Sequence, residues 1–88
     1  MIRRHAELAT RAVLLATVRT RPLVAVEQVG RSRFASYVTA TGDRLTVQLA
    51  NNVIPAVWVR PWAGGEWYRV GGWLLYRKIN RMLPEETT

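Results

Sequence analysis

The chain contains no cysteine, one histidine and one lysine, and these shortages exclude several kinds of site. Without cysteine the protein forms no disulfide bonds and offers no thiolate to a metal, and a reducing compartment is permitted. With His5 as its only imidazole, it has too few ligands of the usual kinds for zinc. We therefore expect no metal, no cofactor and a cytoplasmic location.

Acidic side chains are also scarce, and they are scattered along the chain. Only Glu85 and Glu86 are adjacent, so no carboxylate pair suited to acid–base catalysis can be inferred. A Ser-His-Asp triad would need His5 and Asp43 to converge, which no sequence pattern suggests. The paired glycines lack the spacing and the lysine of a phosphate-binding loop. The sequence thus predicts a protein that is not an enzyme.

Long hydrophobic runs are missing as well. The longest uninterrupted apolar stretch runs from Val53 to Val59, whereas a membrane-spanning helix needs about 18 apolar residues or more. We therefore predict that the protein does not interact with a membrane.

Arginine and apolar residues are what the chain has in abundance. Its 88 residues are 49% hydrophobic, which fits one globular domain. Of its 13 cationic residues all but Lys78 are arginine, giving a net charge of +7 and an isoelectric point near 11.3. The Arg-over-Lys bias is typical of GC-rich coding DNA and fits a bacterial source. The charge favours anionic partners, either nucleic acid or an acidic protein surface.

Hydrophobic periodicity predicts a helix, then several short strands, then a second helix. The two predicted helices cover residues 2–19 and 73–83. The predicted strands cover residues 23–29, 33–40, 44–50, 56–62 and 66–70, and residues 84–88 read as a flexible tail. The fold class is α+β with a four- to five-stranded antiparallel sheet. A small, strongly bent barrel is the alternative.

The apolar faces of these elements predict the core. In the first helix the apolar arc includes Ala12, Val13 and Ala16, and in the last helix it includes Trp73 and Met82. The predicted core consists of Leu8, Ala12, Leu15, Leu23, Val38, Leu45, Val47, Leu49, Val57, Val59, Val70, Leu75 and Ile79.

The most informative pattern is the hairpin formed by the last two strands. A loop at residues 63–66 would place Trp62 opposite Trp67 and Arg60 opposite Arg69. Because side chains alternate along a strand, Trp58 joins these four on one face. Indoles interleaved with guanidinium groups suit single-stranded nucleic acid, through base stacking and phosphate contacts.

Two other interpretations of this face stay open. Trp and Arg also dominate protein interfaces, so the face suits a protein partner in a homodimer, a homo-oligomer or a larger complex. Alternatively, an outer helix covers the tryptophans while arginine stacks on them and shields the sheet.

Further arginines give three weaker candidates for a binding surface. Arg31 and Arg33 lie in or beside a predicted turn, where they can contact phosphates or keep a loop soluble. Arg77, Lys78 and Arg81 share the polar face of the last helix, where cations also interact favourably with the helix dipole. Arg3, Arg4 and Arg11 form a similar face on the first helix.

Overall fold

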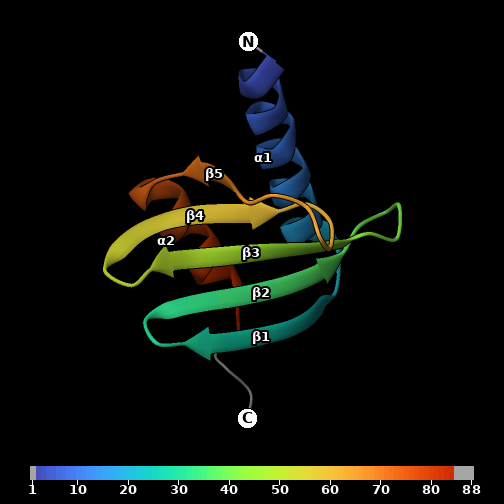
Figure 1. Cartoon of the computed structure of the whole chain (residues 1–88). Coiled ribbons are helices and arrows are strands. Elements are labelled where there is room, and N and C mark those ends of the chain that lie inside the picture. The colour runs from blue at the N-terminus through green and yellow to red at the C-terminus, as the bar shows by residue number, and fades with distance from the viewer. Residues whose placement is uncertain (1, 85–88) are drawn as a thin grey trace.

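The computed structural model describes the backbone of residues 2–84 and the side chains of residues 10–84. It confirms the α+β class, with one helix at each end of a five-stranded antiparallel sheet (Figure 1). The elements are α1 (Ile2–Thr20), β1 (Leu23–Val29), β2 (Ser32–Val38), β3 (Arg44–Asn51), β4 (Ile54–Arg60), β5 (Tyr68–Gly71) and α2 (Trp73–Met82).

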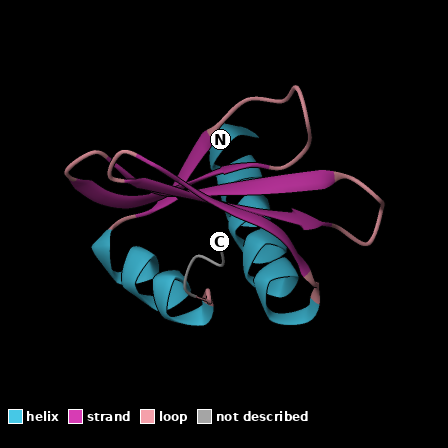
Figure 2. Cartoon of the chain, turned by 90° about the horizontal axis from the view of Figure 1, so that it is seen from below, coloured by secondary structure: helices cyan, strands magenta, loops and turns pink. Residues whose placement is uncertain are grey.

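The sheet is an open meander in which each strand pairs with its neighbours in the sequence, in the order β1-β2-β3-β4-β5. β1 and β5 are the two edges, so the alternative of a closed barrel is wrong. Both helices lie on the same side of the sheet (Figure 2), which gives a two-layer molecule with one uncovered sheet face.

The core lies between the sheet and the helices. Strand alternation places Leu45, Val47 and Leu49 of β3 on the helix side, where all three are buried. β2 departs from the prediction, because Tyr37 is buried whereas Val38 is 43% exposed. The two residues are neighbours on opposite faces of one strand, and here the larger aromatic side chain fills the space beneath the helices.

α1 buries a stripe that only partly overlaps the predicted one. Leu14 is fully buried with Thr10 and Thr17, and the predicted core residue Leu15 is half-buried against the core, whereas Ala12, Ala16 and Val13 are exposed. α1 crosses the strands steeply and its first turns extend past the β5 edge (Figure 1). Alanines bury little apolar area, so the stripe with Leu14 gains more from packing on the sheet than the one with Ala12 and Ala16.

The structure confirms part of the predicted apolar face of α2. Leu75 and Ile79 are buried against the sheet, and Leu83, just beyond the helix, is buried too. Trp73 is 54% exposed and Met82 is 39% exposed, so both lie at the margin of this face and outside the core. Trp73 stacks instead on Tyr76, with the ring centroids 5.9 Å apart. A ten-residue helix packed on a sheet buries one narrow stripe, and side chains flanking it stay in contact with solvent.

Several predictions fall on parts that are not described. The side chains of Arg3, Arg4, His5 and Leu8 lie outside the described residues, as does the tail at residues 85–88. Within the described residues, neither helix has the length and apolar character needed to cross a membrane.

Candidate functional site on the open sheet face

The open face of the sheet carries side chains that alternate with those of the core. Cross-strand pairing arranges them in rows. One row runs through Ala25, Ser36, Thr46 and Arg60. The next runs through Glu27, Phe34, Gln48, Trp58 and Arg69. Neither described helix covers this face (Figure 2), so the interpretation in which an outer helix covers the tryptophans is wrong.

The predicted register of the last hairpin is also wrong, although its division into faces holds. Trp58, not Arg60, lies opposite Arg69, and Val59 lies opposite Tyr68. Because the true register differs from the predicted one by two residues, the side chains that remain in the paired strands keep their predicted faces. The connection is longer than predicted since β4 ends at Arg60, and Trp62 and Trp67 leave the ladder.

Two tryptophans on this face are each paired with an arginine. The Cζ atom of Arg69 lies 5.8 Å from the ring centroid of Trp58, and that of Arg60 lies 5.3 Å from the centroid of Trp67. Such distances are those of cation–π contacts. Trp67 also meets Phe34 of β2 edge to face, with centroids 6.2 Å apart and planes at 70°. We call these five residues the Trp–Arg surface.

The connection between β4 and β5 folds back over the sheet to place Trp67. Trp67 touches side chains from β2 and β4, so it reaches across β3, yet 39% of it is exposed. The contacts with Phe34 and Arg60 hold the exposed indole of Trp67 in position in the free protein. Such preorganisation reduces the entropy lost on binding.

A shallow hollow of about 550 Å³ lies beside Trp67 on the same face. Its aromatic wall is Phe34 and Trp67, and Arg44 and Arg60 also line it. Glu27 is the acidic side chain at its β1 border. With Arg69 included, three arginines and Glu27 lie on the described open face. The net positive charge of these four side chains favours an anion.

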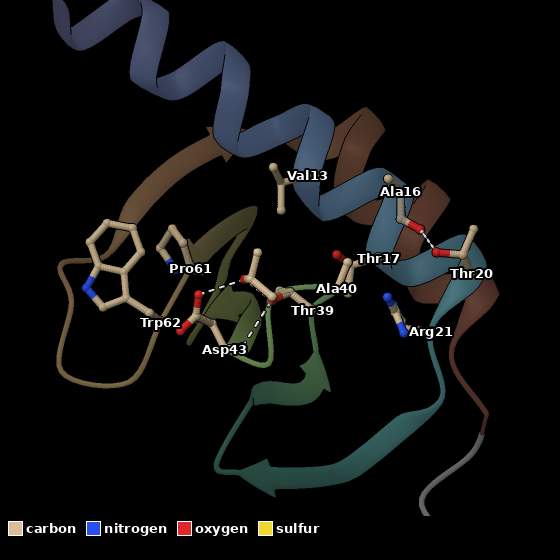
Figure 3. Close-up of a pocket in the computed structure, with 11 residues that line it drawn as sticks. Val13, Ala16, Thr17, Thr20, Arg21, Thr39, Ala40, Asp43, Pro61 and Trp62 are labelled. Carbon is tan, nitrogen blue, oxygen red and sulfur yellow. Dashed lines mark hydrogen bonds between the residues drawn. The ribbon is translucent and has the colours of Figure 1, made fainter.

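Trp62 does not belong to the Trp–Arg surface. It is 50% exposed and lines a separate, mainly apolar groove of about 390 Å³. In Figure 3 the groove lies between α1, from which Val13 and Ala16 project, and the loops that carry Asp43 and Pro61. The predicted set of hairpin tryptophans is therefore divided between two sites.

The two arginines near the first turn have different environments. Arg31 is exposed in the β1–β2 turn. Arg33 faces the helices, donating a hydrogen bond to Oδ1 of Asn80 at 3.1 Å and another to the carbonyl of Pro84. Arg33 thus ties β2 to the end of α2 and is absent from the open face.

The cations of α2 lie on the other side of the molecule from the Trp–Arg surface. Arg77, Lys78 and Arg81 are exposed, whereas Leu75 and Ile79 turn toward the sheet. Arg11 of α1 is exposed as well. These side chains do not form one continuous surface with Arg60 and Arg69, because the sheet lies between them.

The predicted binding residues did not include Phe34, Ser36, Arg44 and Thr46, which also lie on the open face. The binding pattern in the sequence is confined to the last hairpin, whereas these residues belong to β2 and β3. Aligning the faces of all strands across the meander would have placed Phe34 and Thr46 beside Trp58 and Arg60.

No group of three or more His, Asp or Glu side chains that could hold a metal ion occurs among the described residues. No model of a known protein family matches the chain, and neither a curated protein nor a solved structure is measurably similar to it.

Proposed function

We propose that the protein binds single-stranded nucleic acid on the open face of its sheet. The observation that carries the proposal is the pair of Trp–Arg contacts, Trp58 with Arg69 and Trp67 with Arg60, on a sheet face that no described helix covers.

This arrangement supplies both interactions that a single strand requires. Unpaired bases stack on exposed aromatic rings, and guanidinium groups beside those rings contact the phosphates. A duplex fits less well, because its bases are already stacked on one another and offer the indoles no free faces. The net charge of +7 adds a long-range attraction to any polyanion.

Tryptophan fluorescence provides the first test. We expect quenching that saturates during titration with a mixed-sequence DNA strand of about 12 nucleotides. The affinity should fall steeply as salt rises from about 50 to 200 mM, because binding releases counterions from the strand. A duplex of the same sequence should bind more weakly.

A matched pair of variants locates the interface. Arg69→Gln and Arg81→Gln each remove one positive charge, the first from the open face and the second from the outer side of α2. We expect Arg69→Gln to weaken binding and to reduce the slope of log K against log salt by about 0.7. Arg81→Gln should leave both quantities close to those of the unmodified protein.

Two outcomes would contradict the proposal. One is an absence of binding to either strand form at low salt. The other is equal loss from Arg69→Gln and Arg81→Gln, which would mean that net charge alone attracts the strand.

The apolar groove beside Trp62 favours a second candidate function, self-association. Val13, Ala16 and Trp62 expose apolar area there, and burial of such area drives protein association with little sensitivity to salt. Sedimentation velocity should then show a dimer that Trp62→Ser converts to monomer, while Trp73→Ser does not. A monomer at every concentration would exclude this function.

A further inference from the structure

The floor of the hollow on the open face consists of small and hydroxyl-bearing side chains. Ser36 of β2 lies opposite Thr46 of β3, and Thr46 lies opposite Arg60 of β4. Ser36 and Thr46 are each only 9% exposed. Two hydroxyl groups therefore lie at the bottom of a concave site that is bordered by aromatic and cationic side chains.

Arg60 contains an unsatisfied hydrogen-bond donor at this site. Its Nε is the one buried side-chain nitrogen or oxygen among residues 10–84 that lacks a hydrogen-bond partner. An unpaired buried donor on a charged group is costly, and native structures rarely keep one without a ligand, water or ion to accept from it. The donor belongs to a side chain that lines the hollow but is itself shielded from solvent, so an acceptor bound there satisfies it once the Arg60 side chain turns toward the ligand.

The hydrogen-bond donors that line the hollow suit the acceptor oxygens of a phosphoryl group. Two guanidinium groups, from Arg44 and Arg60, and two hydroxyl groups can all donate to an anion with several acceptor oxygens. The edge-to-face pair of Phe34 and Trp67 forms the adjoining wall, against which a planar base can lie. Glu27 at the β1 border repels a second anion and can accept hydrogen bonds from sugar hydroxyls or base amines.

We propose that this hollow binds one nucleotide unit, with its phosphoryl group over Ser36 and Thr46 and its base against Phe34 and Trp67. The inference deepens the proposed function, on which it rests, by assigning a defined nucleotide subsite within the open face. The remainder of a bound strand extends over Trp58 and Arg69.

Small ligands separate the phosphoryl contact from the base contact. We expect AMP to bind about 10-fold more tightly than adenosine, since charge-assisted hydrogen bonds are available only to AMP. Inorganic phosphate should compete with AMP, and ribose 5-phosphate should bind more weakly than AMP because it lacks a base. Equal affinities for AMP and adenosine would overturn the subsite.

The double variant Ser36→Ala/Thr46→Val tests the floor of the hollow. Both replacements keep nearly the same shape while removing the hydroxyl groups, and Thr20→Val on α1 is the matched control. We expect the double variant to lose most of the preference for AMP over adenosine, and the control to keep it. An unchanged preference in the double variant would refute the assignment.

The Arg60 Nε–H resonance provides a readout that does not depend on any variant folding. Addition of AMP or inorganic phosphate to the unmodified protein should shift this resonance strongly downfield, as expected for a donor that gains an anionic acceptor. An unshifted resonance at saturating AMP would contradict the proposal.

The subsite and the proposed function can fail separately. Strand binding that is weakened by Arg69→Gln but not by Ser36→Ala/Thr46→Val leaves the proposed function standing and refutes the subsite. Preference for AMP without any strand binding leaves the subsite standing and refutes the proposed function.

Discussion

Arg33 and Arg60 differ in the face of the sheet on which each lies, and this difference decides what each does. Arg33 points toward the helices and is occupied by hydrogen bonds to Asn80 and to the Pro84 carbonyl. Arg60 lies on the open face and keeps an unpaired Nε beside Trp67. The same residue type is thus held by hydrogen bonds on one face and keeps an unpaired donor on the other.

Tyr37 is the residue whose ionisation should limit stability at high pH. Burial raises the pKa of its phenol above 10, while the neighbouring charge of Arg33 opposes this shift. Since the folded protein favours the neutral phenol, this stabilisation is fully present below about pH 10 and is lost as pH rises through the higher folded-state pKa.

We therefore expect Tyr37→Phe to flatten the decline of the free energy of unfolding above about pH 10. Urea unfolding monitored by circular dichroism measures this dependence. Tyr76→Phe, at a half-buried position on α2, is the matched control. If the unmodified chain and Tyr37→Phe lose stability in parallel, another group is responsible.

Among the elements, α1 shows that the hydropathy of a helix does not by itself determine which of its sides packs on the sheet. Its buried stripe contains Leu14 with two threonines, and its exposed side contains Val13 with two alanines. The steep crossing over the sheet, with the first turns beyond β5, determines the contact (Figure 1).

Substitutions on the two stripes of α1 should differ greatly in cost. Leu14→Ala removes a fully buried side chain and leaves a cavity, so we expect a loss of about 2–5 kcal/mol in the free energy of unfolding. Val13→Ala, at a position 44% exposed, should change it by less than about 0.5 kcal/mol. A larger loss from Val13→Ala than from Leu14→Ala would mean that α1 docks in the orientation that the sequence predicted.

The strands were predictable because local signals define them. Leu45, Val47 and Leu49 alternate with polar residues, and glycine or asparagine marks the turns that separate neighbouring strands. The placement of Val38 and Trp73 was not predictable in this way, since Val38 alternates with Tyr37 across β2 and Trp73 stands at the start of α2, at the margin of its buried stripe. Which neighbour is buried depends on the element packed against it, and that information is not local.

The candidate site was predictable in part for the same reason. Alternation correctly assigned Trp58, Arg60 and Arg69 to one face, even though the register was wrong by two residues. The contact between Trp67 and Phe34 could not be foreseen, because it depends on a connection folding over β3. Neither could the separation of Trp62, which follows from β4 ending at Arg60.

At the scale of the molecule, the two-layer arrangement gives each surface its own chemistry. The open sheet face combines aromatic rings with guanidinium groups, whereas the exposed cations of α2 belong to the helix layer. The groove with Trp62 lies at one end, between α1 and two loops (Figure 3). A strand on the open face and a second copy at the groove therefore do not compete for the same residues.

The contact between α1 and β5 also bears on how the chain is made. Each strand pairs with the next in sequence, so hairpins can form as soon as both strands exist, but α1 packs on β5 at the far end of the chain. Such distant contacts pay a larger loop-closure entropy and form late. During synthesis α1 leaves the ribosome before the strands, and its buried stripe finds its partner only after β5 has been made.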